Sequence, residues 1–342
     1  MTQNRQWRLR RRPVGDISAG DLELVTEPVS VPGPGEILVR NVYLSLDPTN
    51  RIWMSDQEQY MPPVRIGDVM RGGTIGVVEV SNHPDFAVGD YVRPGIGGWQ
   101  DYSIARSDGP FPARKLPAIA GLPLTSFMSA LGSTGATAYF GLLKIGQPKA
   151  GETIVVSAAA GAVGQVVGQI GKILGCRVVG IAGSADKCRY VVDELGFDAC
   201  IDYRTEDVAA ALKKHCPNGI DVDFENVGGT IMDAVIANMN FKGRIALCGL
   251  ISQYNAKDAV PGPYNFPLIL MKRLKVEGFI VLDFAAQTGE FIAAMGPWVA
   301  SGQVKDRVTV VEGLENAVQS LGLLFSGGNT GKLLVRIGAE KQ

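Results

Sequence analysis

Apolar residues in the middle of the chain alternate between short continuous runs and helical stripes. Residues 153–157, TIVVS, form a β-branched run typical of a strand buried in a parallel sheet. Apolar side chains then recur at 163, 166, 167, 170 and 174, the spacing of one helix face. Strand-like runs follow at 177–182, 199–203, 222–227 and 244–250, with a helix that Ser184 can cap and Gly196 can end, and another over 207–215. This alternation predicts a doubly wound α/β sheet.

The segments on either side follow a different pattern. Runs at 31–46, 72–80 and 86–94 alternate apolar and polar residues between Pro/Gly turns, which predicts a compact, mostly antiparallel β domain. After a strand at 275–281 and a helix to about residue 300, the tail predicts a strand, a helix, a glycine-rich turn and a last strand. We expect this tail to return to the first domain. The predicted domains are therefore 1–126 with 305–342, and an inserted 127–304.

Charge and hydropathy narrow the classes of partner. The 342 residues carry 33 Lys and Arg against 34 Asp and Glu, a balance that disfavours a nucleic-acid binder. The arginines near the N-terminus are not followed by the apolar segment of a signal peptide, and no stretch suits a membrane-spanning helix. We expect a cytoplasmic protein that binds neither nucleic acid nor membrane.

Cysteine and histidine are too sparse and scattered for a zinc site. The five cysteines lie between Cys176 and Cys248 with no CxxC pair, residues 1–175 contain none, and the chain has only two histidines. We therefore expect no metal site. An odd number of widely spaced cysteines also suits a reducing compartment.

The segment SAAAGAVG, Ser157 to Gly164, lies between a predicted strand and a predicted helix. In that context Gly161 allows the backbone to approach a pyrophosphate, and Gly164 allows close helix packing. Ala159 replaces the first glycine of the usual GxGxxG pattern, so an ordinary glycine turn is the alternative. The strand–turn–helix context favours a dinucleotide site.

The end of the second strand indicates which dinucleotide binds. An NAD site usually has an acidic residue there for the ribose 2′-hydroxyl, whereas this strand ends in Ala182-Gly183-Ser184. Lys187 and Arg189 follow closely, and basic residues suit the 2′-phosphate of NADP. The acidic Asp186 nearby weakens the case for NADP slightly. The alternative for Lys187 is an ordinary solvated lysine on a helix.

Several longer segments resemble one branch of the medium-chain dehydrogenase/reductase family. The chain is similar to the zinc-independent, NADP-dependent alkenal and prostaglandin reductases, the branch of leukotriene B4 12-hydroxydehydrogenase and bacterial curcumin reductase. The matching segments are ordered along nearly the whole chain: YLSLDPTNRIWM (43–54), TAYFGLLKIGQPKAGETIVVSAAAGAVG (137–164), FENVGG (224–229), LCGLISQYN (247–255), EGFIV (277–281) and GGNTGKLLV (327–335). The resemblance implies a Rossmann domain inserted into a GroES-like β-rich catalytic domain.

The resemblance also implies the residues of the site, by motif. Tyr254 of SQYN matches the tyrosine proposed for catalysis in this branch, and Arg51, Tyr60 and Tyr254 are the candidate substrate-binding residues. The expected NADP(H)-binding residues, including those argued above, are Thr137, Gly161, Ala162, Val163, Gly183, Lys187, Tyr203, Asn226, Cys248, Gly249, Phe279 and Asn329. Departures such as Ser133-Thr134 in place of the common Met-Pro leave the substrate open.

The implied reaction is NADPH-dependent, metal-independent reduction of the C=C bond of a small-molecule enone or enal. It requires donors where negative charge develops on the carbonyl oxygen and a proton for the α-carbon, from Tyr254 or a water. A quinone oxidoreductase, oxidation of a secondary alcohol and a non-catalytic NADPH-binding protein are the alternatives. We also expect a homodimer.

Overall fold

The computed structural model describes residues 2–117 and 121–341, which form two compact units. The first unit comprises Met1–Met128, Thr309–Gly328 and Leu333–Gln342, and the second comprises Ser129–Val308 and Asn329–Lys332. The chain therefore leaves the first unit, builds the second and returns. At its edges this division differs from the expected domains. Residues 127–128 group with the first unit, and residues 305–308 and 329–332 group with the second.

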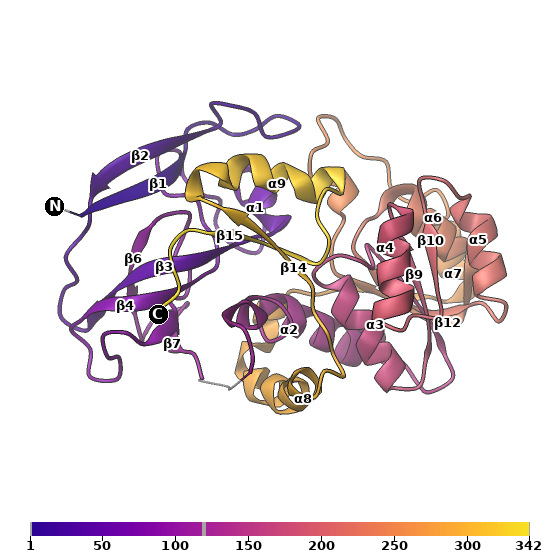
Figure 1. The fold of residues 1–342 in the computed structure, drawn as a ribbon. Coiled ribbons are helices and arrows are strands. Elements are labelled where there is room, and N and C mark those ends of the chain that lie inside the picture. The colour runs from indigo at the N-terminus through magenta and orange to yellow at the C-terminus, as the bar shows by residue number, and fades with distance from the viewer. Residues whose placement is uncertain (1, 118–120, 342) are drawn as a thin grey trace. The chain divides into compact units, whose positions relative to one another are not determined.

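The second unit contains a six-stranded sheet in which every neighbouring pair is parallel. Its strands, in spatial order, are β10 (Ala199–Asp202), β9 (Arg177–Ala182), β8 (Thr153–Ser157), β11 (Ile220–Glu225), β12 (Met239–Leu247) and β13 (Lys275–Gly278). Chain order reverses direction between β8 and β11, which is the switch point of a doubly wound sheet. The predicted fold class is confirmed (Figure 1).

Helices connect these strands: α2 (Ser133–Phe140), α3 (Gly164–Ile173), α4 (Ala185–Arg189), α5 (Val208–His215), α6 (Gly229–Asn238), α7 (Pro267–Lys272) and α8 (Thr288–Ala300). Single π-helical turns, Gly141–Gly146 and Tyr190–Glu194, extend α2 and α4, and 3-10 turns occupy Ile251–Gln253 and Val281–Gln287. The predicted Ser184 cap is confirmed, since its side chain accepts from Lys187 N–H. Asp207 likewise caps α5 by accepting from Ala210 N–H.

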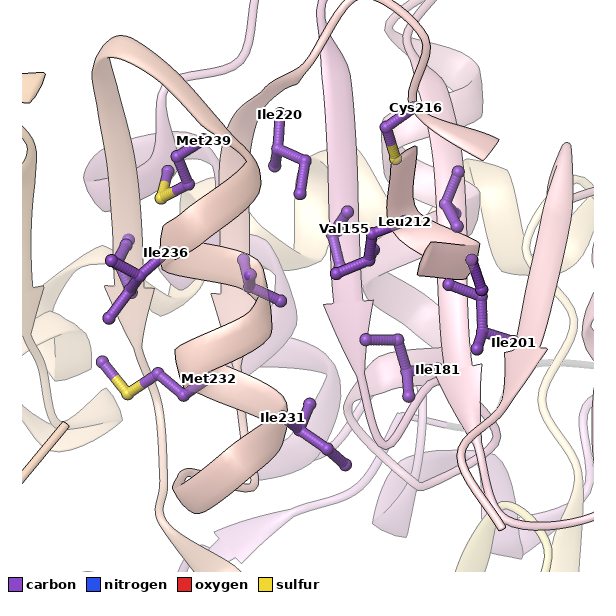
Figure 2. Close-up of a cluster of buried hydrophobic side chains, with 14 of the residues drawn as sticks. Val155, Ile181, Ile201, Leu212, Cys216, Ile220, Ile231, Met232, Ile236 and Met239 are labelled. Atoms are coloured by element: carbon purple, nitrogen blue, oxygen red, sulfur yellow. The ribbon is translucent and has the colours of Figure 1, made fainter. Parts of the chain in front are cut away.

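Alternation along the strands places one apolar layer between the sheet and α5–α6. Val155, Ile181 and Ile201 contribute from β8, β9 and β10, and Leu212 and Ile236 are among the helix residues that cover them (Figure 2). Side chains between these strand positions face the opposite side of the sheet, which α3 and α4 cover.

The first unit is built largely on antiparallel strands. Its larger sheet has the order β14 (Val308–Glu312), β15 (Lys332–Arg336), β3 (Glu36–Leu46), β4 (Thr74–Ser81), β5 (Tyr91–Arg93) and β7 (Arg114–Lys115), with β6 (Tyr102–Arg106) paired to β3. A hairpin of β1 (Gln3–Leu9) and β2 (Leu22–Pro28), the helices α1 (Thr49–Trp53) and α9 (Ala317–Ser326), and the 3-10 turns Leu124–Met128 and Leu314–Asn316 complete it. Because β15 pairs with β3, the predicted return of the tail is confirmed.

Some element boundaries differ from prediction. The strand expected at 275–281 ends at Gly278, and a 3-10 turn follows from Val281. The strand expected at 244–250 begins earlier, at Met239, and ends at Leu247. The turns beyond these two strands hold several of the predicted site residues. In the described ranges, no helix is both long and apolar enough to span a bilayer.

Candidate dinucleotide-binding site

Most of the predicted cofactor residues lie at the carboxyl ends of the parallel strands in the second unit. Gly183 follows β9 and Tyr203 follows β10, while Asn226, Cys248 and Phe279 follow β11, β12 and β13. Ligands of open α/β sheets bind at this edge, near the switch point. The sheet therefore gathers residues that are far apart in the sequence.

The turn after β8 approaches α3 very closely. A Cβ atom on Gly164 would lie 2.4 Å from the carbonyl oxygen of Ala158, and one on Gly161 would lie 3.0 Å from the same atom. Ala158 itself has φ of 50°, a left-handed conformation uncommon for alanine. Helix α3 begins after Val163 with no side-chain cap, and Ala162 and Val163 are half-buried at its start. Main-chain N–H groups at such a helix start suit a phosphate.

The segment containing Asn329 runs beside this turn. Gly331 forms a parallel bridge with Gly161, and its N–H donates to the Ala160 carbonyl at 2.7 Å. The Asn329 amide donates to the Gly331 carbonyl at 2.9 Å. The structure thus brings Asn329 near the phosphate turn from the far end of the chain.

Two cations and a tyrosine gather beyond β9 and β10. The Tyr203 ring crosses Gly183, where an added Cβ would lie 2.8 Å from the phenol oxygen, and the Arg204 guanidinium carbon is 6.0 Å from the ring centre. Burial and the charge of Arg204 both lower the pKa of Lys187, so the two cations are close. Asp186, the acidic residue nearby, forms an ion pair with Arg189 on its own helix. This arrangement favours a bound anion.

A buried carboxylate shapes the turn after β11. Oε1 of Glu225 accepts from Ser157 Oγ at 2.7 Å and from Gly228 N–H at 2.9 Å. Asn226 is held against the end of β8, because its amide donates to the Ser157 carbonyl at 2.7 Å. The positions of Asn226 and the Gly228 turn therefore depend on Ser157 and Glu225.

Tyr254 folds back on the end of β12. Its hydroxyl oxygen accepts from Leu250 N–H at 3.0 Å, and a Cβ on Gly249 would lie 2.9 Å from that oxygen. The main-chain N–H groups of Cys248 and Gly249 donate to the Glu225 carbonyl. The phenol oxygen is therefore held beside Gly249 at the carboxyl edge of the sheet.

Phe279 has packing contacts within the second unit, and Thr137 has a hydrogen bond within its own helix. The Phe279 ring packs edge-on against Phe224 and occupies the space above Gly141. The Thr137 hydroxyl donates to the Ser133 carbonyl one turn back in α2. Contact of either side chain with a cofactor remains a prediction.

The substrate candidates of the first unit, Arg51 and Tyr60, differ in their surroundings. Arg51 is buried, and its guanidinium donates to the carbonyls of Pro13 and Gly15. It therefore fastens the 13–15 loop to α1, and any effect on substrate would pass through that loop. The Tyr60 hydroxyl lies 2.5 Å from Thr49 Oγ1 and accepts from Trp53 Nε1 at 3.1 Å.

Sequence reasoning missed Arg204 and Glu225. Arg204 immediately follows Tyr203 at the end of β10, so the rule that ligands bind at carboxyl ends of strands could have found it. Glu225 carried no such signal, because its role depends on β8 lying next to β11.

Metal-binding side chains do not cluster in the part of the chain that the structure describes. Within residues 2–117 and 121–341, no group of three His, Cys, Asp or Glu side chains could hold a metal ion.

Comparison with known proteins places the chain in a family. Residues 5–112 match the family model for the N-terminal domain of oxidoreductases, and residues 162–300 match the model described as zinc-binding dehydrogenase. The chain is 47% identical to an NADPH-dependent curcumin reductase of Escherichia coli, over 99% of this chain and 98% of that protein. It belongs to the medium-chain dehydrogenase/reductase family, in the branch of alkenal and prostaglandin reductases.

Two further relatives support this place in the medium-chain dehydrogenase/reductase family. A 2-alkenal reductase of Nicotiana tabacum is 41% identical, with 98% of each chain covered. The crystal structure of CurA from Vibrio vulnificus in complex with NADPH is 47% identical and superposes with a TM-score of 0.90, covering 98% of this chain and 99% of that one.

Proposed function

We propose that this protein reduces the C=C bond of an α,β-unsaturated ketone or aldehyde with NADPH and without a metal. The observation that carries the proposal is the Tyr254 hydroxyl, held by Leu250 N–H beside Gly249 at the edge of a dinucleotide-binding sheet. The relatives named curcumin reductase and 2-alkenal reductase cover nearly the whole chain. A metal-independent reaction is supported by the lack of cysteine in residues 1–175.

The residues at the sheet edge fit NADPH. The turn at Gly161 and the uncapped start of α3 would bind the pyrophosphate. Lys187 and Arg204 would bind the 2′-phosphate beside Tyr203, since two cations held close together favour an anion between them. Asn226, Cys248, Gly249, Phe279, Asn329 and Thr137 are proposed to line the ribose and nicotinamide.

The chain's own residues would position the substrate and supply a proton. When bound, NADPH supplies the hydride that saturates the β-carbon. Negative charge then develops on the carbonyl oxygen and requires hydrogen-bond donors. A phenol is protonated at neutral pH, and the Tyr254 oxygen already accepts from Leu250 N–H. A protonated phenol can give up its hydrogen, so Tyr254 is the proposed proton donor to the substrate.

The first unit is proposed to be the GroES-like catalytic domain (1–126 and 305–342). In it Tyr60 would contact the substrate, and Arg51 would act on the substrate through the 13–15 loop. The Rossmann domain (127–304) would bind the cofactor. A cytoplasmic location is supported by five free cysteines, which suit a reducing compartment.

We also propose that the protein is a homodimer. Among the described residues, β13 pairs on one side with β12 and forms the edge of the sheet. Exposed apolar side chains gather in the adjoining sequence, at Phe266, Leu270, Met271 and Val276. An open strand edge beside apolar side chains suits pairing with a second copy about a two-fold axis.

The reaction is tested with purified, metal-free protein, NADPH and a panel of an enal, an enone, a quinone and a secondary alcohol with NADP⁺. We expect cofactor oxidation with the enal or enone. In Tyr254→Phe the turnover number should fall by about a hundredfold with NADPH affinity unchanged, whereas Tyr264→Phe, at a residue 79% exposed, should match wild type. Preference for the quinone would indicate a quinone oxidoreductase. NADPH binding with no turnover would indicate a non-catalytic binding protein.

A further inference from the structure

Two cysteine side chains meet on the α4 side of the Rossmann sheet. Cys188 is in α4, and Cys200 is in β10. Because Ala199 and Ile201 join the apolar layer beneath α5 and α6, Cys200 faces the other side, toward α4. Its sulfur lies over β9, where a Cβ on the paired residue Gly180 would be 3.3 Å away.

The two thiols are neighbours. The same Cβ on Gly180 would lie 3.1 Å from Val191 Cγ1, and α4 contacts β10. Val191 is one turn beyond Cys188 on the same helix face, so Cys188 also faces Cys200. Contact with the Cys200 thiol lowers the pKa of Cys188, and contact with Cys188 raises the pKa of Cys200. Both residues are partly exposed. Cys188 is therefore the candidate attacking sulfur of the pair, with a second thiol beside it.

The remaining cysteines all have raised pKa values. Burial raises the pKa of Cys176, of Cys216 to about 11, and of Cys248 to about 12. All five cysteines of the sequence are in the described ranges, so a reactive pair is specific to positions 188 and 200.

The two cysteines are also close in the sequence to the cations of the proposed 2′-phosphate site. Cys188 immediately follows Lys187, and Cys200 is three residues before Tyr203 and four before Arg204. A bond between the two sulfurs would tie the helix that carries Lys187 to the strand that carries Tyr203 and Arg204.

We propose that Cys188 and Cys200 are a modification site that hydroperoxides oxidise to a disulfide, and that this disulfide weakens NADPH binding. The Cys188 thiolate attacks the peroxide oxygen, the O–O bond breaks, and an alcohol or water leaves. Cys200 sulfur then attacks the sulfenic sulfur of Cys188, and the hydroxyl leaves with the Cys200 proton as water. Two thiols are oxidised and one peroxide is reduced. The effect on NADPH rests on the proposed function, whereas the disulfide itself does not.

The disulfide changes the geometry of the cation cluster. A disulfide holds its sulfurs about 2.05 Å apart, far closer than two thiols in contact, so α4 must move toward β10. Lys187 would then shift relative to Tyr203 and Arg204. We expect NADPH to bind about tenfold more weakly, comparable to one charge-assisted hydrogen bond. By linkage, saturating NADPH should raise the reduction potential of the pair by about 30 mV for that tenfold change.

The experiment exposes the full chain to hydrogen peroxide and maps its disulfides by mass spectrometry under non-reducing conditions. Trypsin would release Cys188–Arg189 and Tyr190–Arg204, so the bond appears as these two peptides joined. The joined peptide should form in wild type and in Cys176→Ser, whose thiol donates to the Lys149 carbonyl elsewhere in the unit. It should be absent in Cys188→Ser and Cys200→Ser.

Binding of NADPH and NADH to the same samples completes the test. Peroxide should weaken NADPH binding in wild type and leave NADH binding and both serine variants unchanged, and dithiothreitol should restore it. Absence of the joined peptide, or a joined peptide with unaltered NADPH affinity, overturns the inference. Failure of the reduced wild type to bind NADPH would instead overturn the proposed function and the coupling, while the peptide map would still decide whether the disulfide forms.

Discussion

At the scale of single residues, Lys187 and Arg204 best connect the sequence to cofactor choice. Lys187 is half-buried near Arg204, and the charge of Arg204 adds to burial in lowering its pKa. Lys187→Ala or Arg204→Ala should weaken NADPH binding by about ten- to a hundredfold, because a charge-assisted phosphate contact is lost. NADH, which lacks the 2′-phosphate, should bind as before. Titrations with both cofactors check this prediction, and Lys213→Ala, at an exposed position of α5, is the control. Equal losses for both cofactors would contradict the assignment.

Asp223 and Glu225 form a buried carboxyl pair on β11. Burial and the neighbouring Glu225 raise the pKa of Asp223, and burial raises the pKa of Glu225 against the opposing bond from Ser157. Among the described residues neither oxygen of Asp223 has a hydrogen-bond donor of good geometry. The folded protein therefore retains a proton that the unfolded chain releases above about pH 4. As a result, the free energy of unfolding falls as the pH rises from that value toward the raised pKa of the pair.

Asp223→Asn should remove most of this pH dependence. At pH 8 we expect the free energy of unfolding to rise by about 1–3 kcal/mol, the usual cost of an unsatisfied buried polar group. At pH 5 the gain should be smaller, because the wild-type pair is already protonated more fully. Urea unfolding at the two pH values measures the difference, with Asp193→Asn on the exposed surface as control. A larger increase in the free energy of unfolding at pH 5 than at pH 8 would contradict the view that the buried pair retains a proton.

At the scale of elements, glycine lets α3 approach the rest of the unit closely. A Cβ on Gly168 would lie 1.7 Å from the Phe197 ring. Gly168→Ala should therefore destabilise the protein by about 1–3 kcal/mol through overpacking. The matched change Gly322→Ala in α9, where nothing lies within 4 Å, should stabilise by about 0.5–1 kcal/mol, because alanine favours helices. Thermal unfolding of both variants checks the opposite signs, and a stable Gly168→Ala would contradict the packing.

At the scale of the whole molecule, the open edge at β13 should determine assembly. Leu270, in α7 five residues before β13, is 73% exposed. Leu270→Glu should raise the dimer dissociation constant by at least about tenfold, because it buries a charge in an apolar interface. Val88→Lys, at an exposed apolar residue of the first unit, is the control. Light scattering after size exclusion measures the mass, and a wild-type mass of one chain would contradict the proposed homodimer.

The sequence by itself determined the features whose cause is local. The strand–turn–helix around Gly161, the helix capped by Ser184 and the alternation of strands and helices follow from hydrophobic period and cap residues within a few positions. The prediction that Lys187 binds a phosphate also rests on a local pattern, and that binding remains a proposal. Boundaries such as that of β13 were less predictable, because the hydrophobic run continues beyond Gly278 into a turn.

Only the tertiary structure decided which of these local pieces become neighbours. The strand order places β10 beside β9 and β11 beside β8. That order brings Arg204 to Lys187, Cys200 to Cys188, and Glu225 to Ser157. The structure also shows that the Arg51 guanidinium donates to main-chain carbonyls. Such contacts depend on long-range strand pairing, and no pattern within a short window of sequence specifies them.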